Sequence, residues 1–539
     1  MSKRDFATAD CETDPFKFNR EPKPFVWGFY HPKTGFRHFF KTEDFVDFIK
    51  DKKIILYFHN GGKFDVHFLL PFIAPQNNIM IVDGRICKIK LGECEIRDSW
   101  LNFPDKLSAY KKDDIDYKKM EKKRRNKNMP EILKYLEGDC FYLYELLEEN
   151  FNSYGQKISL AATAFDFWHK KFLKDVKPST SKSFFDDFKK YYYGGRCQFF
   201  KQGLVKKEFK MYDINSAYAD AMKEDHPYGT EYEESTRIIE GVLEKSFIHL
   251  RGRSFGALPF RDAGLSFPCD ADLRDFYCSG REIKTGLETG TLEIDKVYSV
   301  KIFRSTINFS DYIDYFYNKK AEMKGVSETQ YILAKKYLVT LYGKYGMNPE
   351  DHKEYILAEQ KYILAHEKYG YEFESIMGKY ALLGRPVNDT KKKYYNVATA
   401  ASITAFVRAY LFETMLGCED VLYCDTDSIV CSEFSGKLGK NLGEWSEEGI
   451  FKSGAIAGKK MYAFEYKKPP TKNNKKVTHK ISSKGVKLNA KQIYSIAEGA
   501  VVRYKNKAPT LKIVGDPISF LVRDVRGTGK ASILKKGKN

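Results

Sequence analysis

The sequence lacks the cysteine and histidine groupings that mark zinc modules and disulfide frameworks. Its ten cysteines are scattered singly with no CxxC pair, and its ten histidines form no cluster at ligand spacing. It has no apolar run approaching the roughly 18 residues that a membrane span requires. The opening residues 1–5 contain no apolar signal-peptide core. We therefore expect a soluble protein of a reducing, cytoplasmic environment, with no membrane contact.

Length and charge narrow the class of protein further. A chain of 539 residues is too long for one hydrophobic core and indicates about three or four domains. Its 42% hydrophobic and 15% aromatic content excludes a mostly disordered protein. The 91 lysines and arginines outnumber the 72 aspartates and glutamates, which gives a net charge of +19. Such an excess is common in proteins that hold a polyanion, although general surface basicity gives the same total.

Residues 423–428, Tyr-Cys-Asp-Thr-Asp-Ser, carry the strongest chemical signal. Apolar β-forming residues flank them, which predicts two strands joined by a tight turn. Asp425 and Asp427 lie two residues apart in that turn, so their charges repel each other. A hard divalent cation held by oxygen ligands is the natural counter-charge. A plain surface turn uses the same residue types, so this segment alone leaves both interpretations open.

Two other segments of the C-terminal half carry groups that suit the same site. Residues 209–214 predict a strand that delivers Asp213 into a turn opening a helix, and this third carboxylate could share a pair of metal ions with the turn. Residues 335–343 predict a helix in which Lys335 and Tyr342 lie on neighbouring turns. An ordinary amphipathic core helix is the alternative for the second segment.

Acidic residues recur at three places in the N-terminal part. Residues 6–13 predict a strand, and Asp10 and Glu12 project together because side chains two apart point to one face. An apolar strand over residues 54–58 runs into a Gly-Gly turn, after which Asp65 stands at the opening of a helix. A charged strand end and a helix cap are the plain alternatives for these two places.

The third acidic place is a predicted helix over residues 132–140. Tyr135 and Asp139 are four residues apart there and so share one face. Two divalent ions held by carboxylates can bind a phosphodiester, activate a water and stabilise the leaving oxyanion. The four carboxylates available for such a pair are those of Asp10, Glu12, Asp65 and Asp139.

Taken in order, these motifs resemble those of protein-primed family B DNA polymerases, most like the tectivirus-type phage enzymes. The exonuclease-like motifs are Asp10-x-Glu12, Asn60-x-x-x-Phe64-Asp65 and Tyr135-x-x-x-Asp139. The polymerase-like motifs are Tyr192-x-Gly194-Gly195, motif A from Asp213, motif B from Lys335 to Gly343, residues 404–408, motif C at residues 423–428, and Lys460-x-Tyr462. Ala217 and Ala219 depart from the family's motif A, and Val339 and Thr340 from its motif B.

The resemblance implies a role for each matched residue. In the exonuclease, Asp10, Glu12, Asp65 and Asp139 would hold metal ions, and Tyr135 would orient the attacking water. Asn60, Phe64, Ser99 and Lys112 would contact the single-stranded 3′ end or its scissile phosphate. In the polymerase, Asp213, Ile214 and Asp427 would hold metal ions with Asp425 in support, and Ser216, Tyr218, Lys324, Lys335 and Tyr342 would bind the nucleotide. Tyr192, Gly194, Gly195, Thr404, Arg408, Lys460 and Tyr462 would contact DNA.

The resemblance also implies the architecture. We expect an α/β (α+β) fold with an RNase H-like exonuclease domain and a right-hand polymerase carrying two terminal-protein-region insertions. The expected domains are an exonuclease over 1–160, a first palm part over 161–228, a first insertion over 229–300, fingers over 301–347, a second insertion over 348–394, a second palm part over 395–487 and a thumb over 488–539. The long spacings between motifs A, B and C leave room for the insertions.

The implied function is DNA-directed DNA polymerisation that replicates a linear genome from a protein primer, with 3′-5′ proofreading and strand displacement. The implied partners are template-primer DNA, dNTPs and a terminal protein, and the implied cofactor is Mg²⁺, two ions per active site, with Mn²⁺ as a substitute. We expect a monomer in the host cytoplasm if a phage encodes the chain. Three alternatives stay open: a primer-independent family B polymerase, a stand-alone exonuclease whose C-terminal half only binds DNA, and a non-catalytic DNA-binding scaffold.

Overall fold

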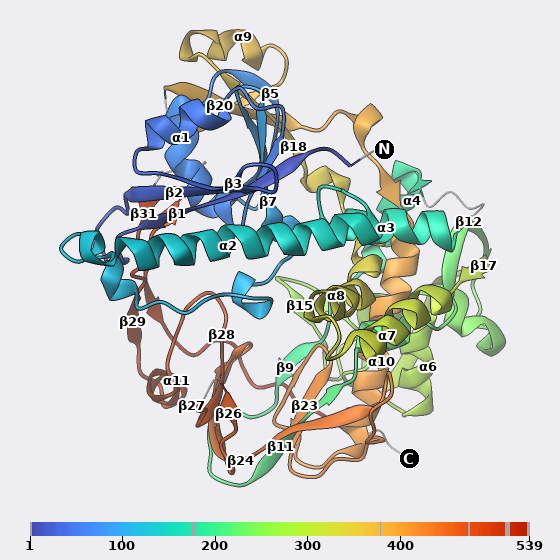
Figure 1. The fold of residues 1–539 in the computed structure, drawn as a ribbon. Helices are drawn as coiled ribbons and strands as arrows, with labels where there is room; N and C mark the ends of the chain where they lie inside the picture. The colour runs from blue at the N-terminus through green and yellow to red at the C-terminus, as the bar shows by residue number, and fades with distance from the viewer. Residues whose placement is uncertain (1–2, 174–178, 378, 473–474, 512–517, 536–539) are drawn as a thin grey trace.

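The structure is a computed structural model that describes residues 3–173, 179–377, 379–472, 475–511 and 518–535. Its longest helix, α2, crosses the middle of Figure 1, with one large sheet above it and a second sheet below. The helices are α1 (Thr42–Ile49), α2 (Arg125–Tyr154), α3 (Leu160–Lys171), α4 (Lys182–Phe188), α5 (Ala217–Ala221), α6 (Gly280–Glu288), α7 (Ser310–Met323), α8 (Glu328–Tyr345), α9 (Ile363–Glu367), α10 (Val397–Gly417) and α11 (Ala490–Ala497). Across the described ranges, none of them is both long and apolar enough to cross a bilayer.

The N-terminal residues build most of a ten-stranded sheet in the order β19-β20-β18-β5-β6-β7-β4-β1-β2-β3. Its strands are β1 (Phe6–Thr13), β2 (Pro24–His31), β3 (Gly35–Phe39), β4 (Ile55–Phe58), β5 (Gln76–Val82), β6 (Arg85–Leu91), β7 (Cys94–Asp98), β18 (Lys353–Ala358), β19 (Glu372–Met377) and β20 (Tyr380–Pro386). Strand β4 lies between parallel neighbours, β1 and β7, and it is apolar and buried throughout because its alternate side chains enter the hydrophobic clusters on the two faces of the sheet. Helix α2 packs against β1 and β2, which brings its acidic face over the sheet.

Strands from the second half of the chain extend this N-terminal sheet. β18 pairs with β5, with Tyr355 opposite Ile79, although more than 250 residues separate them. These strands fall inside residues 348–394, which the sequence predicts as an insertion between polymerase segments. The segment therefore bridges the two halves of the molecule.

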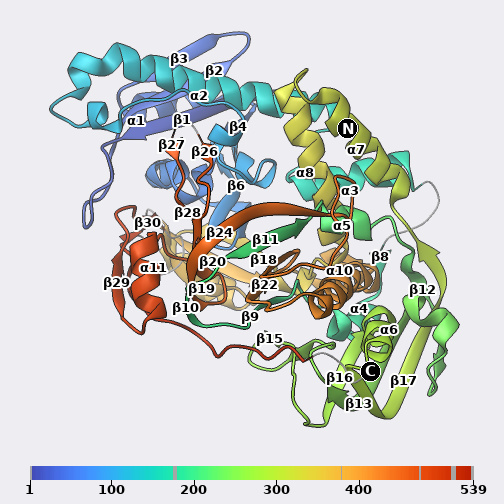
Figure 2. The same cartoon turned by 90° about the horizontal axis from the view of Figure 1, so that it is seen from below.

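The second large sheet has the order β28-β25-β24-β11-β23-β22-β9, with β10 also paired to β24. Its strands are β9 (Cys197–Phe199), β10 (Gly203–Val205), β11 (Phe209–Ile214), β22 (Tyr423–Asp425), β23 (Ser428–Cys431), β24 (Trp445–Gly458), β25 (Met461–Tyr466) and β28 (His479–Ser483). Figure 2 shows these strands at the centre, with α11 and β29 on one side and α10 on the other. The predicted strand of residues 209–214 and the predicted strand-turn-strand of motif C are thus confirmed as adjacent strands.

The remaining elements surround this sheet. A four-stranded sheet, β12 (His226–Ser235), β17 (Leu292–Ile307), β13 (Ser246–Ser254) and β16 (Arg274–Ser279), carries α6. Helices α7 and α8 pack against each other. Short paired strands are β8 (Ser179–Thr180) with β21 (Tyr394–Tyr395), β14 (Phe260–Arg261) with β15 (Leu265–Ser266), β26 (Thr471–Lys472) with β27 (Lys475–Lys476), β29 (Val502–Lys505) with β32 (Val522–Val525), and β30 (Thr510–Leu511) with β31 (Ile518–Ser519).

One local prediction differs in detail from the structure. The helix expected to open at Asp65 is a 3-10 helix, Asp65–Phe72, and not an α-helix. Pro71 lies inside it, and in an α-helix the proline ring would clash with the carbonyl group of His67, four residues earlier, which disfavours the α form.

Candidate active sites

The first candidate site lies where β22 and β23 meet β11. Thr426 occupies the left-handed region with φ of 63°, which closes the turn and places Asp425 and Asp427 on either side of it. Asp213, at the end of β11, stands opposite Ser428 in the neighbouring strand. The N–H of Ile214 donates to the carbonyl oxygen of Asp427 at 2.8 Å. Segments more than 200 residues apart in sequence therefore place their carboxylates at neighbouring strand ends, on the same side of the sheet.

The electrostatics of these acids favour a cation between them. Burial and the charge of Asp427 raise the pKa of Asp213 to about 7. Burial, together with the charge of Asp425, raises the pKa of Asp427 to about 6. A divalent cation between them would remove this repulsion, and carboxylate oxygens suit Mg²⁺. Lys460 supplies part of the charge, because its Nζ lies 2.7 and 2.8 Å from the two carboxylate oxygens of Asp425.

The segment predicted as a YxGG motif, residues 192–195, packs against this turn together with Arg196. The N–H of Thr426 donates to the carbonyl oxygen of Arg196 at 2.6 Å. A Cβ at Gly195 would come within 2.8 Å of the Thr426 methyl carbon, so only glycine allows this close approach. Arg408 donates from Nη1 to the carbonyl oxygens of Tyr193 at 2.7 Å and Gly194 at 3.0 Å. The motif thus positions the acidic turn through backbone contacts.

An aromatic stack stands beside the acids. The rings of Tyr218 and Tyr342 lie parallel, with centroids 4.6 Å apart and planes 11° apart. Tyr218 belongs to α5, which begins after Ser216, a residue with φ of 52°, and Tyr342 belongs to α8. The structure therefore brings together one tyrosine from motif A and one from motif B, both predicted to bind the nucleotide.

The lysines of the two packed helices α7 and α8 form a cationic group. Lys335 on α8 and Lys324, just after α7, are both exposed. Burial and the charges of these two lysines lower the pKa of Lys320 on α7. Sequence reasoning missed Lys320, which lies in the last turn of α7, four residues before the C-cap residue Lys324; this spacing was the available signal. Three ammonium groups near one helix pair suit a polyphosphate.

The second candidate site lies on the N-terminal sheet. Three carboxylates meet there, from Asp10 and Glu12 on β1 and from Asp139 on α2. One oxygen atom of each lies within 4.8 Å of the other two, so these three residues could hold a metal ion. Asp65 joins them from the 3-10 helix, with an Oδ1 atom that accepts from the N–H of Cys11 at 3.2 Å. The structure therefore gathers the four acids that the sequence indicates.

The pKa values in this acid group are raised. Burial, followed by the charges of the neighbouring carboxylates, raises the pKa of Asp10 well above its ordinary value and that of Glu12 to about 8. Burial also raises the pKa of Asp65 to about 6. Oδ1 of Asp139 is buried and accepts no hydrogen bond among the described residues. These donors fit a divalent cation, which would neutralise the group and satisfy that oxygen.

A lysine and two tyrosines border the acid group. Nζ of Lys112 lies 2.6 Å from Oδ2 of Asp139 and 5.0 Å from the centre of the Tyr135 ring. The hydroxyls of Tyr135 and Tyr117 are 3.1 Å apart. The predicted residues Tyr135 and Lys112 thus lie beside the acids, and Tyr117 is a neighbour that the sequence analysis did not single out.

The residues predicted to contact single-stranded DNA differ in their exposure to solvent. Asn60, with φ of 63°, and Phe64 are half-buried at the edge of the acid group. A cavity of about 1030 Å³ is lined by Asn60 and Lys112 and by Val477 from the C-terminal half. Ser99 is fully buried, and its hydroxyl donates to the carbonyl oxygen of Phe58. This side chain closes the end of strand β4, and the contact of Ser99 with DNA stays a prediction.

Three residues predicted to contact DNA in the polymerase half are also buried. Thr404 and Arg408 on α10 are each 2% exposed, and Tyr462 on β25 is 7% exposed. The guanidinium of Arg408 forms a buried ion pair with Glu282 at 2.8 Å, and the Tyr462 ring stacks on Phe464. The observed contacts of Arg408 and Tyr462 lie within the protein, and the contact of these three residues with DNA stays a prediction.

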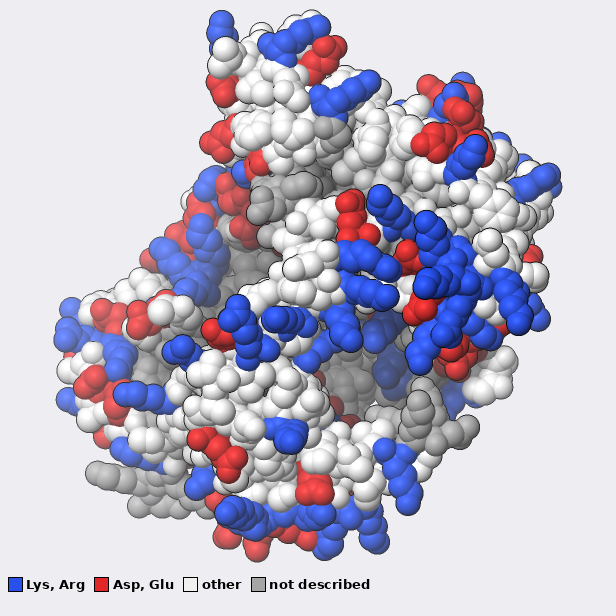
Figure 3. Space-filling model, turned by 90° about the vertical axis from the view of Figure 1, so that its left-hand side faces the viewer, with Lys and Arg blue, Asp and Glu red and all other residues white. Residues whose placement is uncertain are grey.

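Basic side chains gather on one face of the molecule. Figure 3 views the left-hand side of Figure 1, where lysines and arginines form a band beside a hollow. The N-terminal end of α2 lies on that side, and Lys122, Lys123, Arg124 and Lys127 are exposed there. Such a band suits a polyanion.

The two acidic groups lie one on each large sheet, and each contains the carboxylates of one set of the motifs found in the sequence. The family model described as DNA polymerase type B, organellar and viral, matches residues 95–437, and the chain belongs to this family. It is similar to the DNA-directed DNA polymerase of Enterobacteria phage PRD1, with 33% identity over 97% of this chain and 98% of the relative. It is also similar to the DNA polymerase of Bacillus phage phi29, with 23% identity over 78% of this chain and 79% of the relative.

The solved structures confirm the predicted fold class. A phi29 DNA polymerase structure aligns with a TM-score of 0.77 at 18% identity and covers 98% of this chain and 100% of that chain. The phi29 polymerase in complex with primer-template DNA and incoming nucleotide aligns with a TM-score of 0.74. The chain is a DNA-directed DNA polymerase of family B, and the predicted mixed α/β architecture is correct.

Proposed function

We propose that this polymerase replicates DNA from a protein primer and trims 3′ ends at the N-terminal acid group. The observation that carries the exonuclease is the convergence of Asp10, Glu12 and Asp139 within 4.8 Å on the N-terminal sheet. Protein priming is supported by the motif resemblance and by the similarity to the PRD1 enzyme along nearly the whole of both chains.

In the polymerase site, Asp213 and Asp427 would hold two Mg²⁺ ions, with Mn²⁺ as a substitute, and Asp425 in support. These ions would activate the primer 3′-hydroxyl and neutralise the leaving pyrophosphate. The chain itself supplies position and charge. The stacked rings of Tyr218 and Tyr342 lie beside the acids, where they would position a bound nucleotide and shield it from water.

In the N-terminal site, the carboxylates of Asp10, Glu12, Asp65 and Asp139 would hold the metal ions for phosphodiester hydrolysis. Lys112, beside Asp139, is placed to neutralise the scissile phosphate. Tyr135 presents a hydroxyl toward the group, and the hydroxyl of Tyr117 fixes its direction. Asn60 and Phe64 line the approach for a frayed, single-stranded 3′ end.

In this proposal, the exonuclease and polymerase activities belong to separate domains. The exonuclease occupies 1–160, and the palm occupies 161–228 with 395–487. The four-stranded sheet within 229–300 is our candidate surface for the terminal protein. Residues 348–394 bridge the two halves, which suits a part that surrounds DNA during strand displacement. Residues 301–347 form the fingers and residues 488–539 the thumb. We further propose that the protein works as a monomer in the host cytoplasm.

Separate active sites predict separable losses of activity. The double variant Asp10→Ala, Glu12→Ala should degrade a labelled primer on the order of a hundredfold more slowly in Mg²⁺, since it removes two of four metal ligands, while primer extension continues. Asp427→Ala should do the reverse. Asp51→Ala, an exposed acid of the N-terminal part, is the matched control and should change neither activity. Loss of both activities in both variants would contradict two independent sites.

Protein priming predicts a covalent product. Incubation of the enzyme with template, labelled dNTP and a candidate terminal protein should give a protein-nucleotide adduct that resists denaturation. Efficient synthesis on a bare template without that protein would instead support a primer-independent polymerase, and the priming proposal would be abandoned.

A further inference from the structure

Helix α8, which carries motif B, is hydrogen-bonded to the N-terminal part of the chain. It lies against the C-terminal end of α2, where Figures 1 and 2 both show the two helices close together. Residues seven apart on a helix share one face, since seven residues make almost two full turns. Gln330 and Tyr337 are such a pair on α8, and both are buried. One face of this helix is therefore turned toward the expected exonuclease domain.

The amide group of Gln330 is held at both ends by α2. Its Nε2 donates to Oε1 of Glu149 and, at 3.0 Å, to Oγ of Ser153. Its Oε1 accepts from the hydroxyl of Tyr154 at 3.2 Å. Three side chains at the end of α2 thus contact this one residue, and together they fix the position of the first turn of α8.

Tyr337 makes the most enclosed contact between the two helices. Its hydroxyl donates to Oδ1 of Asn150 at 2.7 Å, and these two residues are 0% and 2% exposed. The ring of Tyr337 packs on Tyr154 with centroids 4.5 Å apart and stacks on Phe316 of α7 at 5.0 Å. A buried acceptor that loses its donor is not solvated in exchange, so this hydrogen bond is costly to break.

A second pair of positions on α8 contacts residues 105–110. Nζ of Lys336 pairs with the carboxylate of Asp105, and the hydroxyl of Thr329 donates to the hydroxyl oxygen of Tyr110 at 3.0 Å. These four side chains are partly exposed, and ion pairs that water can reach contribute little. The buried contacts with α2 are therefore the stronger constraint on α8.

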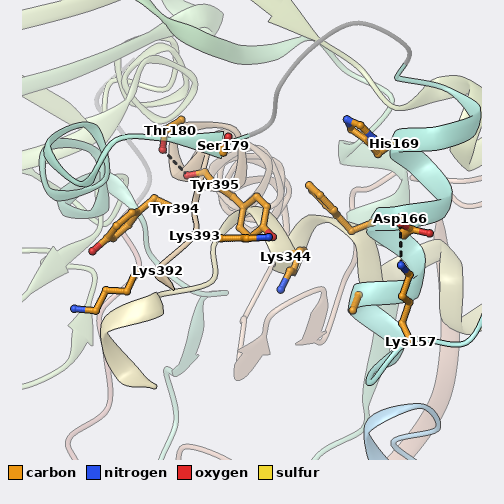
Figure 4. A pocket seen from close by; sticks show the side chains of 12 residues that line it. Lys157, Asp166, His169, Ser179, Thr180, Lys344, Lys392, Lys393, Tyr394 and Tyr395 are labelled. Atoms are coloured by element: carbon orange, nitrogen blue, oxygen red, sulfur yellow. Dashed lines mark hydrogen bonds and ion pairs between the residues drawn. The ribbon is translucent and has the colours of Figure 1, made fainter. Parts of the chain in front are cut away.

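The last turn of α8 is open on one side. Lys344 lines a cavity of about 680 Å³ that this turn shares with α3 and β21 (Figure 4). The hydroxyl of Tyr345, the next residue, accepts from Nε1 of Trp168 on α3 at 3.1 Å. Because open space adjoins this turn, packing alone does not fix the rotation of the helix about its axis. The directional hydrogen bonds at Gln330 and Tyr337 supply that constraint.

The motif B side chains lie on the other side of α8. An α-helix turns about 100° per residue, so Lys335 and Tyr342 stand about 160° and 140° around the helix from Tyr337. Lys335 is exposed, and the ring of Tyr342 lies parallel to that of Tyr218 with centroids 4.6 Å apart. Any rotation of α8 about its axis would therefore displace both motif B side chains in the polymerase site.

We propose that Asn150 on α2 is a positioning residue for the polymerase reaction. By accepting from the hydroxyl of Tyr337, it fixes the rotation of α8 and holds Lys335 and Tyr342 where the incoming nucleotide binds. The N-terminal part thus contributes to nucleotide binding without contacting the nucleotide. The proposal rests on the nucleotide-binding role proposed for motif B, and on neither the exonuclease nor the priming proposal.

The test measures KM for dNTP and kcat in single-nucleotide extension, and Kd for primer-template in EDTA, with the full chain. Asn150→Leu removes the acceptor and should raise KM for dNTP on the order of tenfold, with kcat and the Kd for primer-template nearly unchanged. Asn152→Leu is the matched control, because it makes the same substitution at an exposed position of the same helix. It should leave KM unchanged.

An isosteric variant separates positioning from a loss of stability. Asn150→Asp keeps an acceptor for the Tyr337 hydroxyl but buries a charge, so it should lower the melting temperature while KM for dNTP stays close to that of the unaltered protein. A KM that rises in both Asn150 variants in step with the fall in melting temperature would show a merely structural role and overturn the proposal. An unchanged or lower KM in Asn150→Leu would also overturn it.

Tyr342→Leu tests the premise separately. It should raise KM for dNTP at least as much as Asn150→Leu does. If Tyr342→Leu raises KM and Asn150→Leu does not, the proposal fails while the role of motif B stands. If neither variant raises KM, motif B does not bind the nucleotide, and both proposals fail.

Discussion

Replacing Glu12 by glutamine should stabilise the N-terminal sheet when no metal ion is present. The carboxyl group of Glu12 is buried among like charges, which raises its pKa from 4.5 to about 8. The folded state therefore holds this proton more tightly than the unfolded state does. As the pH rises from below 4.5 to above 8, the unfolded chain releases its proton first, so the metal-free folded sheet loses stability. Glutamine cannot ionise and escapes this loss.

The structure sets the size of the effect. A pKa rise from 4.5 to about 8 corresponds to at most roughly 5 kcal/mol above pH 8. The repulsion is shared, and protonation of Asp10 or Asp65 relieves part of it. We therefore expect Glu12→Gln to gain about 2 to 5 kcal/mol at pH 8 in EDTA and close to nothing below pH 4.5. Mg²⁺ should stabilise the unaltered protein more than the variant, since ligands bind the metal deprotonated.

Native-state hydrogen exchange of the β1 amides measures this local stability without assuming that a chain of several domains unfolds in one step. The variant and the unaltered protein are compared at each pH, so the intrinsic exchange rates cancel. Glu21→Gln, at an exposed glutamate near the same sheet, serves as the control and should show no gain. Equal or weaker protection of β1 in Glu12→Gln at pH 8 without metal would refute the reasoning.

Three further outcomes follow from the polymerase half. Tyr218→Val should raise ribonucleotide incorporation on the order of tenfold or more, because the ring no longer fills the space beside the sugar; unchanged sugar discrimination would remove Tyr218 from that role. Glu282→Gln should lower the melting temperature and cost about 3 to 5 kcal/mol, since it leaves Arg408 buried without a counter-charge, and Arg408→Met in the same chain should recover part of the loss. The Mg²⁺ concentration for half-maximal extension should rise as the pH falls below 7, because protons compete with the ion at Asp213; a pH-independent requirement would contradict this.

The chemically decisive residues could be found from sequence because short-range patterns encode them. A strand-turn-strand around Asp425 and Asp427, a strand that ends at Asp213 and a helix that carries Asp139 all follow from local periodicity, and the structure confirms each element. Lys320 was within reach of the same reasoning, since it lies in the last turn of a helix, four residues before Lys324.

The sequence alone determined which carboxylates this polymerase has and on which strands and helices they stand, because helix and strand periods depend on neighbouring residues. Only the tertiary structure decided which side chains are exposed. Ser99, Thr404 and Arg408 match polar motif positions, yet elements from distant parts of the chain bury them. It also decided that β18 completes the N-terminal sheet, because strand pairing is a contact between backbones far apart in sequence, which no local pattern specifies.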